Sequence, residues 1–281
     1  MINYSEKTRE ILRVEGLTVE FHKKPTLPIR ILSDICFSLN KGEILGLVGE
    51  SGVGKSLLGR TLLRLENPAK ITSGRIFFDG HDLCQKKQKE MQRFRGGKIS
   101  LLFQSPQSNF DPLFTIRDQF EEFLLSHNIH LVKKETYQQY QNHYISKKEY
   151  RETIYRLLEE VGISSPEIRS LQYPHQWSGG MLHRASLAMA IHLQPEVLIL
   201  DEITSALDPT ITCQLLELLI QLNKKHHIAI ILITHDLAVC LKICNRIAVI
   251  YKGTIVETGK ANDIFLKQGH SYTQLLVSTL Y

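Results

Sequence analysis

Apolar residues in the first third of this chain recur at the short spacing of β-strands. Residues 11–21 alternate in the way expected of an edge strand. Residues 29–48 contain two further apolar stretches, which are separated by the polar turn Asn40–Glu43. Another strand is predicted over residues 74–79, where Gly80 ends it. The pattern therefore predicts a region rich in antiparallel strands.

The middle of the chain has a different character. Residues 113–172 predict helices, and the stretch between Ser126 and Tyr150 is rich in Tyr, Gln, Lys and His. Such a biased polar stretch is typical of an exposed insertion. We therefore interpret His127 and His130, which lie in it, as solvated side chains rather than as ligands.

Strands and helices alternate again from Pro195 onward. Val197–Leu200 is short and fully apolar, as expected of a strand inside a parallel sheet. Pro209–His226 predicts an amphipathic helix, with Asp208 as its N-cap and proline at its first position. The remaining predicted strands are Ile228–Ile233, Arg246–Tyr251 and Thr254–Glu257, the last two forming a hairpin.

Composition limits the classes of protein to which the chain can belong. Its 281 residues, 43% of them apolar, suffice for one large domain or two small ones. No apolar run approaches the ~20 residues that cross a bilayer, and the N-terminal stretch lacks the apolar run of a signal peptide. We therefore expect a cytosolic protein, so that any role at a membrane needs partner subunits.

Charge and cysteine content add little chemistry. The net charge is +5, and the basic residues between Lys86 and Lys98 favour a solvated helix face over a nucleic-acid patch. The five cysteines are scattered and form no C-x-x-C pair. Cys240 and Cys244, one helical turn apart, favour a helix face over a metal site, so reduced thiols are expected.

Candidate chemistry begins at Gly49–Ser56, whose sequence G-E-S-G-V-G-K-S fits the phosphate-loop pattern G-x-x-x-x-G-K-[ST]. An apolar strand, residues 44–48, precedes the loop, and a predicted helix, residues 57–63, follows it. In this arrangement the loop N–H groups and the helix N-terminus attract a polyphosphate. Lys55 would face the β- and γ-phosphates, and the Ser56 hydroxyl would bind Mg²⁺. A glycine-rich turn that matches by chance would not explain the flanking elements.

Two carboxylates, Asp201 and Glu202, follow the apolar strand Val197–Leu200. Ligands of open α/β sheets bind at this carboxyl edge. Asp201 is the candidate to hold Mg²⁺, through water, together with Ser56. Glu202 is the candidate general base for the water that attacks the γ-phosphate. Without the phosphate loop, two surface or capping acids would be the simpler interpretation.

A second anion-binding cradle is predicted at Ser178-Gly179-Gly180, which opens a helix of small and apolar residues. Exposed N–H groups, a hydroxyl and a helix N-terminus all attract phosphate. One nucleotide does not need two cradles. Two chains that pair head to tail would each complete the other's site.

These motifs and their order resemble the ATP-binding subunits of ABC transporters over about residues 12–260. Gly49–Ser56 resembles the Walker A loop and Val197–Glu202 the Walker B strand. Ser178–Gly180 resembles the signature motif, which contacts the γ-phosphate of the partner's nucleotide. The resemblance implies an α/β fold: a P-loop NTPase core with an antiparallel β subdomain and a helical subdomain that carries the signature motif.

The resemblance also assigns roles to residues that stand alone in the sequence. Gln104 matches the Q-loop glutamine, which senses Mg²⁺ and faces the membrane subunits. Ser205–Asp208 resembles the D-loop, so Asp208 is expected to contact the partner's site. His235 matches the switch histidine at the γ-phosphate, although by itself it would be interpreted as a buried structural residue. Phe21 falls where the family places an aromatic ring on adenine, and it could equally belong to the core.

The residues expected to bind ATP are Gly49, Glu50, Ser51, Gly52, Val53, Gly54, Lys55, Ser56, Phe21 and Gln104. Those expected to contact the partner's site are Ser178, Gly179, Gly180 and Asp208. Glu202 and His235 are expected to be catalytic. Mg²⁺ is expected at Ser56, Gln104 and Asp201.

Local details resemble the oligopeptide, dipeptide and nickel importer branch of the family. Gln104–Pro112 resembles its extended Q-loop, Met181 stands where most ABC proteins have glutamine, and residues 269–276 resemble its C-terminal tail. Residues 110–113 and 180–184 look slightly closer to members that carry nickel or metal chelates. Peptides and nickel chelates therefore both stay open as the solute.

Two positions depart from the family pattern. Ile203 replaces the proline that usually follows the catalytic glutamate, and Trp177 replaces a smaller apolar residue before Ser178. Neither change removes a charged or phosphate-contacting group.

The resemblance implies a nucleotide-binding domain over residues 11–262, with its helical subdomain at about 113–193, and a C-terminal extension over residues 263–281. It implies ATP and Mg²⁺ as cofactors. The implied partners are a second, related ATP-binding subunit, two integral membrane permease subunits and an extracytoplasmic solute-binding protein, without nucleic acid. The subunit would lie at the cytoplasmic face of the membrane as a peripheral ATPase that energises uptake.

Two alternatives belong to other classes. A soluble ABC protein that acts on nucleic acid or ribosomes usually has two nucleotide domains or a long coiled-coil insertion, which this chain lacks. A regulatory module that binds ATP without hydrolysing it is disfavoured because Glu202 and His235 are both present.

Overall fold

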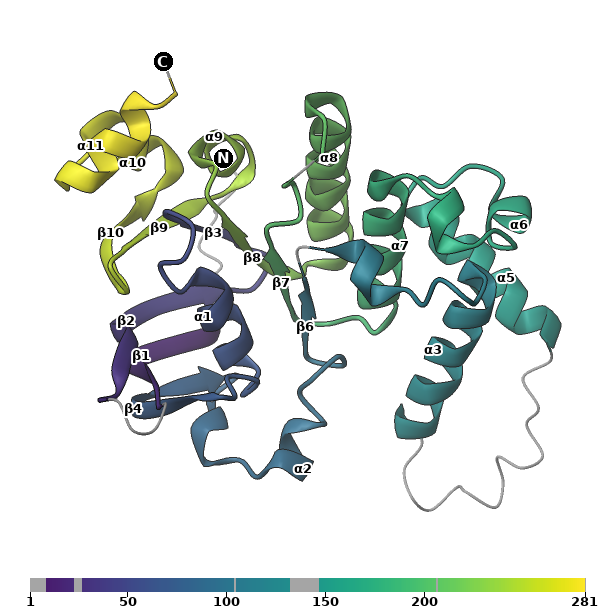
Figure 1. The fold of residues 1–281 in the computed structure, drawn as a ribbon, viewed down its shortest axis with the longest axis horizontal. Helices are drawn as coiled ribbons and strands as arrows, with labels where there is room; N and C mark the ends of the chain where they lie inside the picture. Colours follow the sequence, from purple (N-terminus) through teal and green to yellow (C-terminus); the bar gives the residue numbers. More distant parts are fainter. Residues whose placement is uncertain (1–8, 23–26, 104, 132–146, 206, 281) are drawn as a thin grey trace, which may run out of the picture. The chain divides into compact units, whose positions relative to one another are not determined.

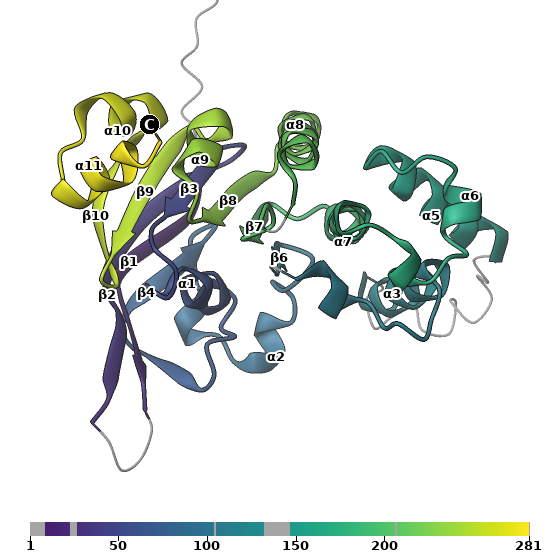
Figure 2. The same cartoon turned by 45° about the horizontal axis from the view of Figure 1, so that its top comes forward.

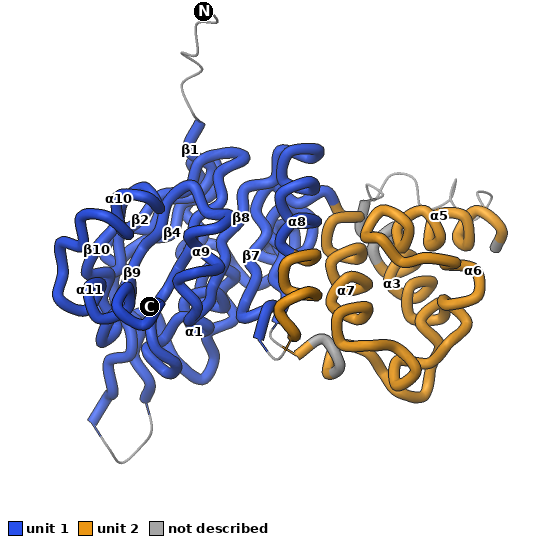
Figure 3. Tube along the Cα trace, turned by 90° about the horizontal axis from the view of Figure 1, so that it is seen from above, with its two compact units in different colours: residues 1–104, 194–205, 216–281 blue, residues 105–193, 206–215 orange. Residues whose placement is uncertain are grey.

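The computed structural model describes residues 9–22, 27–103, 105–131, 147–205 and 207–280. The chain forms two compact units (Figure 3). Unit 1 comprises residues 1–104, 194–205 and 216–281, and unit 2 comprises residues 105–193 and 206–215. Gln104 and most of the predicted insertion lie outside the described residues, as do the side chains of His127 and His130.

Unit 1 contains a four-stranded sheet in the order β2-β1-β4-β5. Its strands are β1 (Glu10–Phe21), β2 (Ile29–Asn40), β4 (Ala69–Phe78) and β5 (His81–Asp82). Because β1 pairs antiparallel with both β2 and β4, the prediction of an edge strand over residues 11–21 is wrong. The alternation along β1 reflects one buried and one more exposed face of the sheet, not a free edge.

The second sheet of unit 1 has six strands in the order β10-β9-β3-β8-β7-β6 (Figures 1 and 2). These are β3 (Ile44–Val48), β6 (Ile99–Leu102), β7 (Val197–Asp201), β8 (Ala229–Thr234), β9 (Arg246–Tyr251) and β10 (Thr254–Lys260). All neighbours are parallel except β10, which runs antiparallel to β9. Every residue of β3, β7 and β8 is buried. Because these strands run parallel, their carboxyl ends lie at one edge of the sheet, where side chains can meet.

The helices of unit 1 are α1 (Lys55–Leu62), α2 (Gln88–Met91), residues 216–226 of α8 (Pro209–His226), α9 (Leu237–Ile243), α10 (Ala261–Lys267) and α11 (Ser271–Ser278). One apolar core joins both sheets and α1, and it includes Leu12, Leu45, Leu58 and Ile231. Since Leu58 and Leu62 of α1 are fully buried, the N-terminus of α1 is fixed at the carboxyl end of β3. In Figures 1 and 2, α10 and α11 lie beside β10.

Unit 2 is helical. It contains α3 (Ile116–Leu131), α5 (Lys147–Glu160), α6 (Pro166–Arg169), α7 (Gly179–His192) and the first turns of α8 (Pro209–His226). α8 begins where the sequence predicts, because the Asp208 carboxylate accepts the N–H of Ile211 at 2.9 Å. In the described ranges every helix is too short or too polar to span a lipid bilayer.

Candidate functional site

The loop between β3 and α1 takes a shape that requires glycine at two points. A Cβ atom on Gly49 would overlap the carbonyl oxygen of Ile250 in β9. Gly54, the N-cap of α1, has φ 104°, a conformation that side chains disfavour. A Cβ there would also lie 2.7 Å from Leu32 Cδ2. The two glycines of the pattern G-x-x-x-x-G are therefore required by the close approach of β9 and β2 to the loop as well as by the turn.

Lys55 folds back over this loop. Its Nζ donates hydrogen bonds to the carbonyl oxygens of Gly49 at 2.7 Å and Glu50 at 2.8 Å. Its side chain is 4% exposed, and Nζ lies 3.8 Å from Glu202 Oε1. Burial lowers the pKa of Lys55, and the carboxylates of Glu202 and Asp201 counter that shift. A buried cation thus stands at the start of α1 with its charge directed into the site.

Ser56 and Asp201 form a pair of oxygen donors beside Lys55. The Ser56 hydroxyl donates to Asp201 Oδ1 at 2.9 Å, across from α1 to the end of β7. Burial raises the pKa of Asp201, and the hydrogen bond from Ser56 acts in the opposite direction. A hydroxyl and a carboxylate are ligands suited to a hard divalent cation.

No cluster of three His, Cys, Asp or Glu side chains suited to a metal ion occurs in the part of the chain that the structure describes. Mg²⁺ is usually held by one or two protein oxygens and completes its shell with water and substrate phosphates. The Ser56–Asp201 pair fits that requirement, whereas a self-sufficient protein metal site would need more donors.

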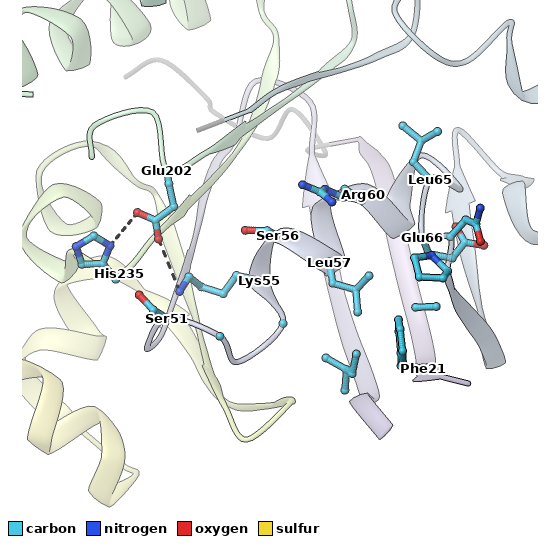
Figure 4. Close-up of a pocket in the computed structure, with 16 residues that line it drawn as sticks. Phe21, Ser51, Lys55, Ser56, Leu57, Arg60, Leu65, Glu66, Glu202 and His235 are labelled. Carbon is cyan, nitrogen blue, oxygen red and sulfur yellow. Dashed lines mark hydrogen bonds and ion pairs between the residues drawn. The ribbon is translucent and has the colours of Figure 1, made fainter. Parts of the chain in front are cut away.

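Glu202 stands between Lys55 and His235. Its Oε2 atom lies 2.8 Å from His235 Nδ1, and its Oε1 atom faces Lys55 (Figure 4). Glu202 has φ 53°, and its N–H donates to the Ile233 carbonyl at 2.9 Å. A buried residue held at positive φ turns away from the strand direction, and such strain is concentrated at functional sites. His235 comes directly after β8 with its side chain 55% exposed, so it is a surface residue at the mouth of the site and not a core histidine.

A cavity of about 470 Å³ opens on these residues in unit 1. Lys55, Glu202 and His235 lie at one end, while Phe21 lies at the opposite end (Figure 4). Phe21 lines the cavity and also packs against the core, so its position is compatible with both interpretations, a ring that contacts the ligand and a core residue. The cavity therefore joins a charged end to an end that offers an aromatic ring, as an elongated ligand with a charged tail and a flat ring would require.

Sequence reasoning missed part of the cavity wall. The unpredicted lining residues are Ile31, Leu57, Arg60, Leu65, Glu66, Asn67, Pro68 and Ala69. Residues 65–68 form the connection before β4, which starts at Ala69, and nothing in their local pattern marks a binding surface. Only the pairing of β4 with β1, which ends at Phe21, brings them to the site.

The predicted partner contacts gather in unit 2. Ser178 caps α7, and its hydroxyl accepts the Met181 N–H at 3.3 Å. A Cβ on Gly180 would lie 2.7 Å from Ile211 Cγ2, and the Ile211 amide is the group that Asp208 caps. The structure therefore links Gly180 to Asp208 through Ile211, and Ser178 caps the helix that contains Gly180. These residues are not among the described residues that line the cavity of unit 1.

Known proteins resemble this chain in sequence over nearly its whole length. Residues 32–205 match the family model described as "ABC transporter". The dipeptide transport ATP-binding protein DppD of Bacillus subtilis (strain 168) is 41% identical, covering 96% of this chain and 77% of that protein. The oligopeptide transport ATP-binding protein OppD of the same organism is 39% identical, covering 98% of this chain and 73% of that protein.

Solved structures share the fold. The cbiO1 protein of Clostridium perfringens, part of the ABC transporter complex cbiONQ, has a TM-score of 0.73 and 25% identity and covers 92% of both chains. The ATP-binding cassette MJ0796 in a dimer bound to ADP and Pi also has a TM-score of 0.73, at 23% identity, covering 89% of this chain and 99% of that one. The predicted fold class is thereby confirmed. Since the family model spans most of the chain and the DppD and OppD relatives span nearly all of it, the chain belongs to the ABC transporter family.

Proposed function

We propose that this chain is the ATP-binding and ATP-hydrolysing subunit of an ABC importer that takes up peptides. The observation that carries the proposal is the meeting of Lys55, Glu202 and His235 at one end of a cavity that also contains the glycine loop. Relatives named for dipeptide and oligopeptide transport cover nearly all of the chain and support the choice of solute.

The triphosphate of ATP would lie along the loop Gly49–Ser56, with its adenine toward Phe21. The loop N–H groups and the N-terminus of α1 attract negative charge. Lys55 would exchange its bonds to the Gly49 and Glu50 carbonyls for the β- and γ-phosphates. Burial of Lys55 strengthens its attraction for phosphate, because little water competes.

Mg²⁺ would be held through the Ser56 hydroxyl and, through water, by Asp201. When bound, the ion would neutralise charge on the β- and γ-phosphates. The Ser56 hydroxyl donates to Asp201 Oδ1 at 2.9 Å, so the two oxygens lie at adjoining positions. Gln104 is proposed as a further ligand and lies outside the described residues.

Glu202 would act as general base in hydrolysis. Its carboxylate takes a proton from water as the water oxygen bonds to the γ-phosphorus, and ADP leaves with the electrons of the broken P–O bond. His235 holds the carboxylate through its Nδ1 contact and would turn its other ring nitrogen to the γ-phosphate. The products are ADP and inorganic phosphate.

The complete site would need a second chain. Ser178, Gly179, Gly180 and Asp208 are proposed to contact the nucleotide held by a partner subunit. Gly179 supports this role because it is the first residue of α7, where helix N–H groups lack a partner within the helix, and because a Cβ atom there would meet nothing closer than Leu207 Cδ2 at 3.9 Å. ATP would thereby hold two subunits together, and its hydrolysis would release them.

The proposed assembly contains a second, related ATP-binding subunit, two membrane permease subunits and an extracytoplasmic solute-binding protein, with this chain at the cytoplasmic face. The names of the DppD and OppD relatives refer to peptides and not to nickel. Uptake of labelled dipeptide and of labelled nickel by cells with and without this subunit would separate the two solutes.

Two measurements test the proposal against its alternatives. ATP turnover by the purified protein, compared with that of Glu202→Gln, tests hydrolysis against a binding-only role. Affinity purification from membranes tests transport against action on nucleic acid: permeases should co-purify. Recovery of RNA or ribosomes without any permease would overturn the transport role.

A further inference from the structure

A side chain from the C-terminal segment reaches the phosphate loop. The hydroxyl oxygen of Tyr272, in α11, accepts the N–H of Glu50 at 2.8 Å, across 222 positions of sequence. Tyr272 is 5% exposed, and Glu50 is the second residue of the loop. Sequence reasoning assigned no role to Tyr272.

Other contacts hold the Tyr272 ring in place independently of the loop. It stacks on Tyr251, the last residue of β9, with ring centroids 4.3 Å apart and an interplanar angle of 25°. His270 Nδ1 accepts the N–H of Tyr272 at 3.1 Å. The Glu257 carboxylate in turn accepts the N–H groups of Gly269 at 2.8 Å and His270 at 3.0 Å. The β9–β10 hairpin therefore fixes the position of the hydroxyl.

Glu50 is thus held at both of its backbone polar groups. Tyr272 holds the N–H, while Lys55 Nζ donates to the carbonyl oxygen at 2.8 Å. On the preceding residue, Gly49 lies against the carbonyl of Ile250. The Tyr272 bond and the Ile250 contact do not involve Lys55, so they still hold the first part of the loop when Lys55 turns to phosphate.

We infer that Tyr272 is a positioning residue for nucleotide binding: its hydroxyl holds the Glu50 peptide and so couples α11 to the phosphate loop. The inference rests on the proposed role of this loop in binding ATP. Because a loop already ordered loses less entropy on binding, removing the hydroxyl weakens nucleotide affinity. By linkage, bound nucleotide stabilises α11 by the same factor.

The test compares two Tyr→Phe variants of the same ring stack in the full-length protein. Tyr272→Phe removes the hydroxyl that Glu50 uses, and Tyr251→Phe removes the hydroxyl from the other ring. Equilibrium binding of a fluorescent ATP analogue in EDTA, and KM and kcat for ATP, are measured for both. Loss of one hydrogen bond should weaken binding and raise KM by about three- to tenfold in Tyr272→Phe, with kcat unchanged. Tyr251→Phe should match the wild type.

Hydrogen exchange gives a readout that does not depend on turnover. Nucleotide should slow amide exchange across residues 269–278 in the wild type and in Tyr251→Phe, but not in Tyr272→Phe. Tyr272→Leu, which also removes the ring stack, should lower thermal stability further yet weaken nucleotide binding by the same factor as Tyr272→Phe.

Unchanged nucleotide affinity in Tyr272→Phe, while the wild type and Tyr251→Phe bind normally, would overturn the inference alone. Lower thermal stability in Tyr272→Phe with wild-type affinity would likewise reduce Tyr272 to a packing residue. If the wild-type protein itself binds no ATP, the proposed function fails first.

Discussion

Glu202 and His235 are 33 positions apart in the sequence, yet Glu202 Oε2 lies 2.8 Å from His235 Nδ1. The other carboxylate oxygen lies 3.8 Å from Lys55 Nζ. One acid therefore lies between a cation from the glycine loop and an imidazole that directly follows the neighbouring strand β8. The arrangement depends on the parallel pairing of β7 with β8, which aligns Asp201 with Ile233 and places Glu202 and His235 just beyond the two strand ends.

Glu202→Gln should lower the kcat of ATP hydrolysis by about 10²- to 10⁴-fold, because the amide cannot take the proton from water. Nucleotide affinity should be retained, since the loop and Lys55 are unchanged. Glu196→Gln is a matched control, because Glu196 pairs with Lys41 and Lys98 outside the cavity. Equal kcat values for wild type and Glu202→Gln in a steady-state assay would remove Glu202 from the mechanism.

Asp201→Asn should change the dependence on Mg²⁺ and leave the phosphate loop intact. An amide at this position keeps the shape but loses the charge opposite Ser56, so the Mg²⁺ concentration for half-maximal activity should rise about ten- to hundredfold. Binding of ATP in EDTA should not weaken, since a negative charge near the phosphates is removed. A Mg²⁺ titration identical to that of the wild type would show that Asp201 does not act on the ion.

Gly180→Ala and Gly179→Ala should differ in stability although the residues are adjacent. A methyl group at Gly180 would lie 2.7 Å from Ile211 Cγ2, whereas at Gly179 the nearest atom is Leu207 Cδ2 at 3.9 Å. Denaturant unfolding should show a loss of about 1 kcal/mol for Gly180→Ala from overpacking. Gly179→Ala should be neutral or slightly stabilising because alanine favours helices. Equal effects would mean that Ile211 moves away freely.

Acid should destabilise the fold through His183. Burial lowers the pKa of this α7 side chain from 6.5 to about 4. Below pH 6.5 His183 binds a proton in the unfolded chain but stays neutral in the folded chain. The contribution of His183 to the free energy of unfolding therefore falls as the pH drops to about 4, and it does not change further below that pH. The loss amounts to about 3.5 kcal/mol at most, at about 1.4 kcal/mol for each unit of the pKa difference.

The variant His183→Leu isolates this contribution. The free energy of unfolding of the variant minus that of the wild type should become more positive as the pH is lowered from 7 to 4. This change is expected whatever the difference is at pH 7. His175, an exposed histidine of unit 2, provides the control, and His175→Gln should follow the wild type across the same range. A difference between His183→Leu and wild type that stays constant with pH would contradict a buried, neutral His183.

Local chemistry made much of the charged end of the site predictable. The phosphate loop and the two acids at the end of β7 are contiguous patterns, so their elements could be placed from sequence. The missed elements have weak local signals: β6 is only Ile99–Leu102, and β4 starts at Ala69, ahead of the predicted residue 74, in a polar stretch that contains Gly74. Gly74 lies too close to the backbone of Gly16 for a side chain, and this reason is visible only in three dimensions.

Contacts between distant residues could not be predicted from one sequence. The Tyr272–Glu50 hydrogen bond joins positions 222 apart, and no periodicity relates them. The edge-strand interpretation of residues 11–21 failed for the same reason, since apolar alternation reports which face is buried but not how many neighbours a strand has.

The close contact between Gly49 and the Ile250 carbonyl makes the phosphate loop mechanically unequal along its length. The start of the loop at Gly49 packs against the sheet, whereas a Cβ atom at Gly52 would have no neighbouring atom within 4 Å. Any displacement that an arriving ligand causes must therefore be absorbed at the tip, and the base of the loop stays a fixed reference point for the rest of the site.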